Sequence, residues 1–239
     1  MSDLKVDGII ASTGTNTALT LQGKGSGKVA IGDGALLFPD ADGSDGQFIK
    51  TDGSAALSFA AAGGGSWNFI GTATASTSAS IGVTGLDATY DMYAIGISEI
   101  RPTTDGSPLT LQLGDSSGYD SGSSDYLYVT SYLVASDGSS TEAYEGDLAN
   151  TDIELAREGV STDDDASVGG MLWLPFPQDT DHKAFVTGRT FSIDTNPQYS
   201  VNSIGGVRLA DIVFDRVQIL FETGNIASGR LTVWGIAHA

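Results

Sequence analysis

The chain has 239 residues and carries 30 Asp and Glu against 11 Lys and Arg, a net charge of −19 at pH 7. This charge disfavours binding to nucleic acid and to anionic membrane surfaces, because both require a cationic protein face. The absence of cysteine excludes disulfides, zinc–thiolate sites and cysteine nucleophiles.

The composition predicts an all-β protein. Glycine is abundant, at 32 residues, whereas the helix-favouring residues Lys, Arg and Met are sparse. No apolar run approaches the length of a transmembrane helix, and Met1–Lys5 lacks the apolar segment of a signal peptide. We therefore expect strands and no membrane insertion.

Residues 1–65 form a segment that cannot bury a core of its own. Short apolar patches are separated by glycine-rich turns, and alternation in 18–22 and 28–31 predicts strands. The apolar residues are too few to offset the entropy of ordering the segment, so it must complete its core against other chains. We predict an extended, intertwined β-ribbon stalk with these core residues: Leu19, Leu21, Val29, Ile31, Leu37, Phe38, Phe48, Leu57 and Phe59.

A second domain, 66–239, follows the small-residue run Ala60-Ala-Ala-Gly-Gly-Gly65, which is typical of a linker. Alternating polarity between turn signals predicts consecutive antiparallel strands. The fold expected from them is a jelly-roll-like antiparallel β-sandwich. The predicted strands are 67–75, 79–84, 90–100, 108–113, 125–135, 171–176, 183–193, 211–222 and 229–237.

Two further expectations concern the second domain. The mixed polarity of 141–158 predicts a long loop or a helical turn around Asp152–Arg157. Trp67, Trp173 and Trp234 all lie in apolar strands, which favours core positions over a ligand platform.

Several stretches resemble the fibre proteins of tailed bacteriophages. In the first domain they are 12–29, Ser-Thr-Gly-Thr-Asn-Thr-Ala-Leu-Thr-Leu-Gln-Gly-Lys-Gly-Ser-Gly-Lys-Val, and 37–59, which contains Gln-Phe-Ile-Lys-Thr-Asp-Gly-Ser. In the second they are 71–76, 89–93 and the closing segment 221–236. The resemblance covers most of the chain except 141–166.

The resemblance implies a homotrimeric structural protein on the virion surface, assembled in the host cytoplasm. Residues 1–65 would provide trimerisation and virion attachment, and 66–239 would be the head. The leading interpretation is a short tail fibre whose head contacts the host surface. The alternative is a capsid decoration (cement) protein at threefold positions, because only Met1–Gly8 precede the ribbon where long fibres carry larger anchors. A secreted carbohydrate-binding module or adhesin is the remote alternative.

The stretch 116–128 is the candidate recognition site. Tyrosine rings suit the flat faces of sugars, and serine hydroxyls and carboxylates suit hydrogen bonding. The predicted receptor-binding residues are Tyr119, Asp120, Asp125 and Tyr126, with a host surface glycan as the partner. The competing interpretation is a flexible hairpin loop whose tyrosines are packed strand residues.

No catalytic, metal or cofactor site is predicted. His182 lies in a polar loop with no nucleophile elbow, and Gly23–Lys28 lacks the spacing and the Ser/Thr of a phosphate-binding loop. Asp40–Gly46 lacks the glycine and glutamate positions of an EF-hand. Cation binding in the acidic loops, such as Asp163–Asp165, stays an open alternative.

Overall fold

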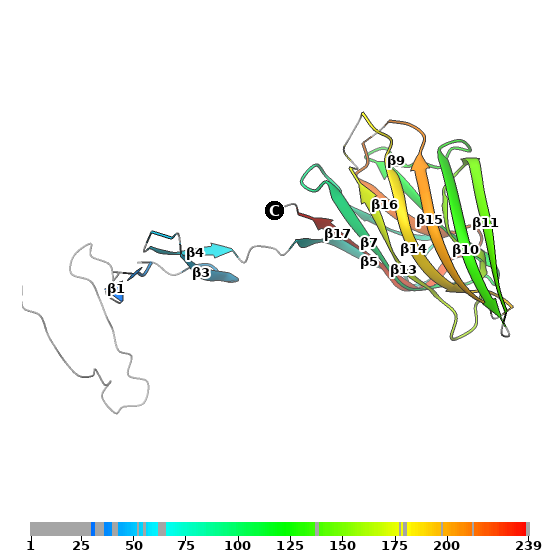
Figure 1. Cartoon of the computed structure of the whole chain (residues 1–239), viewed down its shortest axis with the longest axis horizontal. Coiled ribbons are helices and arrows are strands. Elements are labelled where there is room, and N and C mark those ends of the chain that lie inside the picture. Colours follow the sequence, from blue (N-terminus) through cyan, green and yellow to red (C-terminus); the bar gives the residue numbers. More distant parts are fainter. Residues whose placement is uncertain are drawn as a thin grey trace, which may run out of the picture. The chain divides into compact units, whose positions relative to one another are not determined.

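The structure is a computed structural model that describes residues 30–31, 36–39, 43–51, 53–54, 56–61, 66–136, 139–176, 178, 181–196, 198–211 and 213–237. Across these residues the protein is all-β, with antiparallel strand pairs and no helix, and hence no helix that could cross a membrane. The chain divides into two compact units, Met1–Gly64 and Gly65–Ala239, and the division falls in the glycine run (Figure 1).

The described part of the first unit consists of two local strand pairs. Strand β1 (Ala30–Ile31) pairs with β2 (Leu36–Leu37), and β3 (Gln47–Thr51) pairs with β4 (Leu57–Ala61). All five side chains of β3 are exposed, so this hairpin has no buried face within one chain.

The intertwined ribbon stays a prediction. Leu19, Leu21 and Val29 lie outside the described residues, and for Ile31 and Leu37 only the backbone is described. The other predicted core residues, Phe38, Phe48, Leu57 and Phe59, are half-buried or exposed within the single chain.

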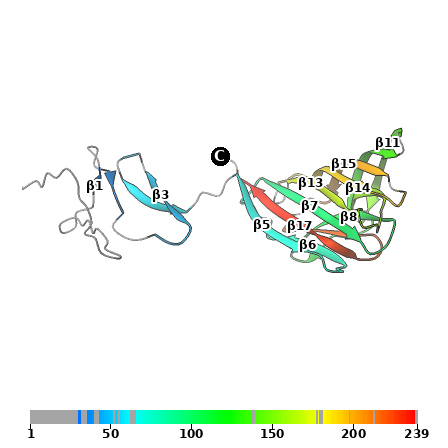
Figure 2. The same cartoon turned by 90° about the horizontal axis from the view of Figure 1, so that it is seen from below.

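The second unit contains two sheets that lie face to face, as in a β-sandwich (Figures 1 and 2). The larger sheet has eight strands in the order β11-β10-β15-β14-β13-β7-β17-β5. The smaller has the order β12-β8-β16-β6, with β9 paired to β8. The strands are β5 (Trp67–Thr74), β6 (Ser80–Thr84), β7 (Met92–Pro102), β8 (Ser107–Asp115), β9 (Gly118–Tyr119), β10 (Tyr126–Ser136), β11 (Ser139–Asn150), β12 (Ile153–Val160), β13 (Val168–Pro175), β14 (Phe185–Ile193), β15 (Tyr199–Arg208), β16 (Arg216–Phe221) and β17 (Ile226–Ile236).

Four pairs of consecutive strands connect the two sheets in the same manner. The consecutive pairs β5/β6, β7/β8, β12/β13 and β16/β17 each place one strand in the larger sheet and one in the smaller. Strands β14, β15, β10 and β11 extend the larger sheet beyond these pairs, and β12 packs beneath β10, β14 and β15.

A continuous hydrophobic core fills the space between the sheets. Period-two alternation sends every second side chain inward, so Ile95 of β7, Leu111 of β8 and Leu172 of β13 are fully buried. Burying a side chain of this size contributes about 1.5–3 kcal/mol. Phe214, just before β16, and Tyr93 are also fully buried.

The expectation for residues 141–158 is wrong, because this segment forms most of β11 and β12. Ile153 and Leu155 alternate at strand spacing and are both fully buried, although acidic residues flank them. Strand β11 is an edge strand whose side chains are mostly exposed, which explains its mixed polarity.

Strand β15 is absent from the predicted strands because Gly205-Gly206 resembles a turn. In the structure both glycines lie inside the strand, opposite β10 and β14. A Cβ atom on Gly206 would lie 2.6 Å from the Ile153 side chain, so β12 can approach only because this position is glycine. A Cβ atom on Gly205, on the opposite face, would meet only the Val129 carbonyl oxygen, at 3.9 Å.

Neighbouring glycine substitutions test this close approach. We expect Gly206→Ala to lower the free energy of unfolding by about 1–3 kcal/mol, because the new methyl group forces β12 away from β15. Gly205→Ala is the matched control and should change it by less than about 0.5 kcal/mol. Urea unfolding followed by tryptophan fluorescence measures both, and equal stabilities would contradict the proposed contact.

Candidate functional site

The predicted recognition residues come together around one buried arginine. The Arg208 Nε atom lies 2.8 Å from the Asp120 carboxylate, and its Nη2 atom lies 3.1 Å from the Asp125 carboxylate. Arg208 also donates to the Asp125 carbonyl oxygen at 3.0 Å, and its guanidinium lies 5.7 Å from the Tyr126 ring centroid. These contacts hold the β9–β10 connection against the end of β15.

Tyr126 is an internal residue of this network. Its side chain is 0% exposed. The hydroxyl accepts from the Leu113 N–H at 2.8 Å and lies 3.1 Å from the Leu113 carbonyl oxygen. Burial raises the Tyr126 pKa, because the phenolate would be desolvated. Tyr126 therefore offers no surface for a receptor.

The other predicted residues are also engaged in internal contacts. Tyr119 is half-buried, with Arg216 5.9 Å from its ring centroid, and burial raises its pKa. The side chains of Asp120 and Asp125 are half-buried, and both carboxylates form ion pairs with Arg208. The geometry thus gives the four residues a structural role. Contact with a receptor stays a prediction for the stretch 116–128, in which residues 121–124 are exposed.

A more extensive candidate site is the side of the larger sheet that points away from the smaller one, here called the outer face. Large apolar side chains remain exposed on it, although strand alternation usually places polar residues on a solvated face. They are Trp67, Phe69, Val129, Leu133, Tyr144, Phe185, Phe191, Tyr199 and Val201.

One part of the outer face is an aromatic cluster at β5, β13 and β17. The Trp67 ring lies 5.7 Å from Trp173 and 5.9 Å from Trp234, in edge-to-face arrangements. Trp67 is 46% exposed and the other two are half-buried. The expectation of core positions for these tryptophans is therefore wrong. Apolar residues occur on both faces of these strands, so an apolar side chain does not by itself indicate the inner face.

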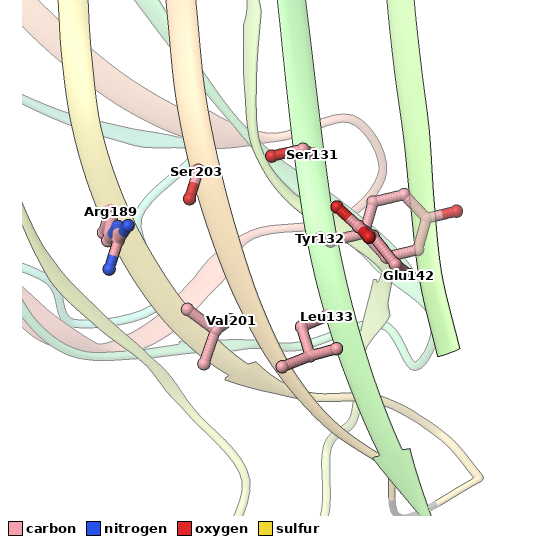
Figure 3. A pocket seen from close by; sticks show the side chains of 7 residues that line it. All are labelled: Ser131, Tyr132, Leu133, Glu142, Arg189, Val201 and Ser203. Carbon is pink, nitrogen blue, oxygen red and sulfur yellow. The ribbon is translucent and has the colours of Figure 1, made fainter. Parts of the chain in front are cut away.

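The other part of the outer face is hollowed over β14, β15, β10 and β11. One depression, of about 330 Å³, is lined by Leu127, Phe185, Val186, Thr187, Gly205, Gly206 and Val207. The next, of about 480 Å³, is lined by Ser131, Tyr132, Leu133, Glu142, Arg189, Val201 and Ser203 (Figure 3). Small residues on β15 and β10 form the floor, because glycine and serine leave space between larger neighbours.

Acidic residues occur in only two of the eight strands of the larger sheet, β7 and β11. Strands β5, β10, β13, β14, β15 and β17 contain no Asp or Glu, in a chain that has 30 of them. Arg189 on β14 and Glu142 on β11 lie on opposite sides of the second depression (Figure 3). Glu142 is close enough to Tyr144 to raise the pKa of that hydroxyl through its charge.

A second group of titratable residues lies near the start of β12. Asp152 and Glu154 are buried, and the Tyr128 hydroxyl donates to Glu154 at 2.8 Å. Burial raises the pKa of Asp152, and burial together with the charge of Asp152 raises the pKa of Glu222. Among the described residues, no three His, Cys, Asp or Glu side chains gather as metal ligands would.

Comparison with protein-family models, curated proteins and solved structures found no match for this chain. The residues of the outer face are therefore the only basis for assigning a function to it. Sequence reasoning missed it, although strands 185–193 and 199–208 carry the signal: their apolar residues fall at odd and even positions alike, as in a strand covered on both faces.

The buried hydroxyl of Tyr126 can be tested with a matched tyrosine. We expect Tyr126→Phe to lower the free energy of unfolding by about 1–3 kcal/mol, because it leaves the buried Leu113 N–H without an acceptor. Tyr199→Phe also removes a hydroxyl, but one that is half exposed, so it should leave stability unchanged within about 0.5 kcal/mol. Chemical denaturation measures both, and a neutral Tyr126→Phe would contradict the structural role.

The raised pKa of Asp152 predicts that replacing this carboxylate by an amide stabilises the protein, and that the gain depends on pH. Its raised pKa means that its charged form is unfavourable in the folded state, so the cost is present at neutral pH and disappears once the group is protonated. Asp152→Asn keeps an oxygen that can accept from Thr151. We expect a higher melting temperature than wild type at pH 7 and the same one below the ordinary aspartate pKa of 3.8. An unchanged difference across this range would contradict the assignment.

Proposed function

We propose that this chain is a homotrimeric structural protein on the surface of a tailed-phage virion, and specifically a short tail fibre whose second unit contacts the host surface. The observation that carries the proposal is apolar surface left uncovered on both units of a strongly acidic chain. Phe48 and Ile49 in the first unit are 48% and 47% exposed, and the outer face of the second unit exposes Phe69 by 64%.

Such surfaces favour an assembly of several copies over a monomer. Monomeric proteins rarely expose contiguous apolar patches larger than a few hundred Å². Closed, symmetric homo-oligomers are the commonest way to cover them. The fibre-like sequence stretches, 12–29 and 37–59 in particular, support the choice of a trimer and of a virion.

The strand order of the second unit supports a jelly-roll head. Its larger sheet contains β5-β17-β7-β13 and its smaller sheet β6-β16-β8-β12, and consecutive strands alternate between the two. This is the arrangement of an eight-stranded jelly roll, a fold found in capsid and lectin domains. In this interpretation β9–β11 and β14–β15 are insertions that widen one sheet, and the exposed residues 121–124 are where a host glycan would bind.

The mass of the purified full-length chain tests the assembly. We expect light scattering to give three times the chain mass of 24.6 kDa, independent of dilution over the micromolar range. Phe48→Ser combined with Ile49→Ser should weaken the assembly, because both side chains would be covered by other copies, while the second unit keeps its circular dichroism spectrum. Thr51→Ser, on the same strand, is the control. A monomeric wild-type chain would overturn the proposal.

Copy number in purified virions separates a fibre from a decoration protein. Quantitative mass spectrometry against the major shell protein should give a small multiple of three copies per particle. Near-stoichiometric abundance with the shell protein would overturn the tail position and place the protein on the capsid.

A further inference from the structure

The hollowed part of the outer face has the composition of a buried interface. In register, Phe191 on β14 lies opposite Val201 on β15, and Val201 lies opposite Leu133 on β10. These three side chains are 44%, 40% and 50% exposed and form an apolar row across three strands. Tyr199 stacks on Phe191, with ring centroids 6.2 Å apart, and lengthens the row.

The distribution of charge identifies which partner fits this surface. Each chain carries a net charge of −19, so two copies repel one another wherever acidic loops meet. Strands β14, β15 and β10 contain no acid, and the one charged side chain they expose is the cation Arg189. Contact through these strands therefore brings fewer acids of two copies together than contact through the acidic loops does.

Two opposite charges flank the hollow without reaching each other. Arg189 makes no hydrogen bond or ion pair with a described residue, and Glu142 has no cationic partner among them. Strands β15 and β10 lie between them, so three strand spacings, roughly 14 Å, separate their backbones. Arg189 and Glu142 can therefore form an ion pair with each other only between two molecules, since no contact within one chain spans that distance.

We propose that the hollowed outer face binds a second copy of this chain, with Arg189 of one copy beside Glu142 of the next. This inference rests on the proposed homotrimer and names the surface by which the heads meet. In a threefold ring, two different regions of one surface must meet. The β14 side with its cation and the β11 side with its anion are two such regions, and the apolar row between them supplies the buried area.

A cysteine pair tests the contact in the full-length chain, which has no cysteine of its own. In the double variant Arg189→Cys/Glu142→Cys, the two sulfurs of one chain cannot join, because a disulfide requires Cα atoms within about 7 Å. Mild oxidation should therefore give covalent oligomers on non-reducing gels. Each single variant should remain at the level of Thr84→Cys, an exposed position in the smaller sheet that reports random collision.

The possible outcomes separate this inference from the proposed function. Oligomers by light scattering without cross-linking above the Thr84→Cys level would overturn the contact and leave the trimer standing. A monomer without cross-linking would overturn both. Occupation of the hollow by a glycan would likewise leave the cysteines unjoined, and so counts against the contact.

Charge reversal provides a second measurement. Arg189→Glu places two acids together across the contact, and Glu142→Arg places two cations together, so each should reduce cross-linking between heads by at least about tenfold. The cross-link is read here through Thr187→Cys on β14 and Tyr144→Cys on β11, added to each charge variant and to the wild type. Strands β15 and β10 separate these two exposed positions, so the two sulfurs of one chain cannot join. Combining both reversals should return the yield to within about twofold of wild type. Equal yields in all four proteins would overturn the ion pair.

Discussion

The second unit depends on the close packing of β12 under the widened part of the larger sheet. Ile153 lies against Gly206, where any larger side chain would collide with it. The buried Thr190 hydroxyl of β14 donates to the Leu155 carbonyl oxygen, and the Tyr128 hydroxyl of β10 donates to Glu154. One strand of the smaller sheet thereby fixes three strands of the larger one, and without it their inner faces would have no cover.

The same packing explains why the outer face is uncovered. The larger sheet has eight strands, and the smaller sheet covers only its inner side. Apart from Arg189 and Arg208, the side chains of strands β14, β15 and β10 are uncharged on both faces, which is the pattern of strands buried on both sides. Within one chain only the inner face of these strands is buried. Their sequence therefore suits a sheet whose inner and outer faces are both covered.

Much of the fold follows from the sequence because period-two alternation and turn residues are local signals. The all-β class and strands such as β5, β7 and β14 are confirmed in this way. Strand β15 is missed because Gly205 and Gly206 occur in turns as well as in strands, and only the approach of Ile153, distant in sequence, decides between the two. Strand β12 is missed because Asp152, just before it, and Glu154, within it, are buried, and the partner of Glu154, Tyr128, is distant in sequence.

The candidate site is harder to predict than the fold, for a related reason. Tyrosine and aspartate in 116–128 have the composition of a recognition loop, yet Asp120, Asp125 and Tyr126 gather around Arg208, which is 83 residues beyond Asp125. The composition of a loop does not reveal whether its polar groups face solvent or an internal partner.

Acidic residues and large apolar residues occupy different parts of this chain, and this separation affects how copies of the chain can associate. Acids occupy connections such as 163–165, whereas most strands of the larger sheet have none. The negative charge of the chain opposes random association, since repulsion acts over roughly a Debye length of about 8 Å at physiological salt. Strands β14, β15 and β10 contribute no acid to this repulsion, so it is weakest for approaches that bury these strands. In the proposed assembly few attractive charges are then needed, because repulsion disfavours approaches through the acidic connections and the apolar row would supply the affinity.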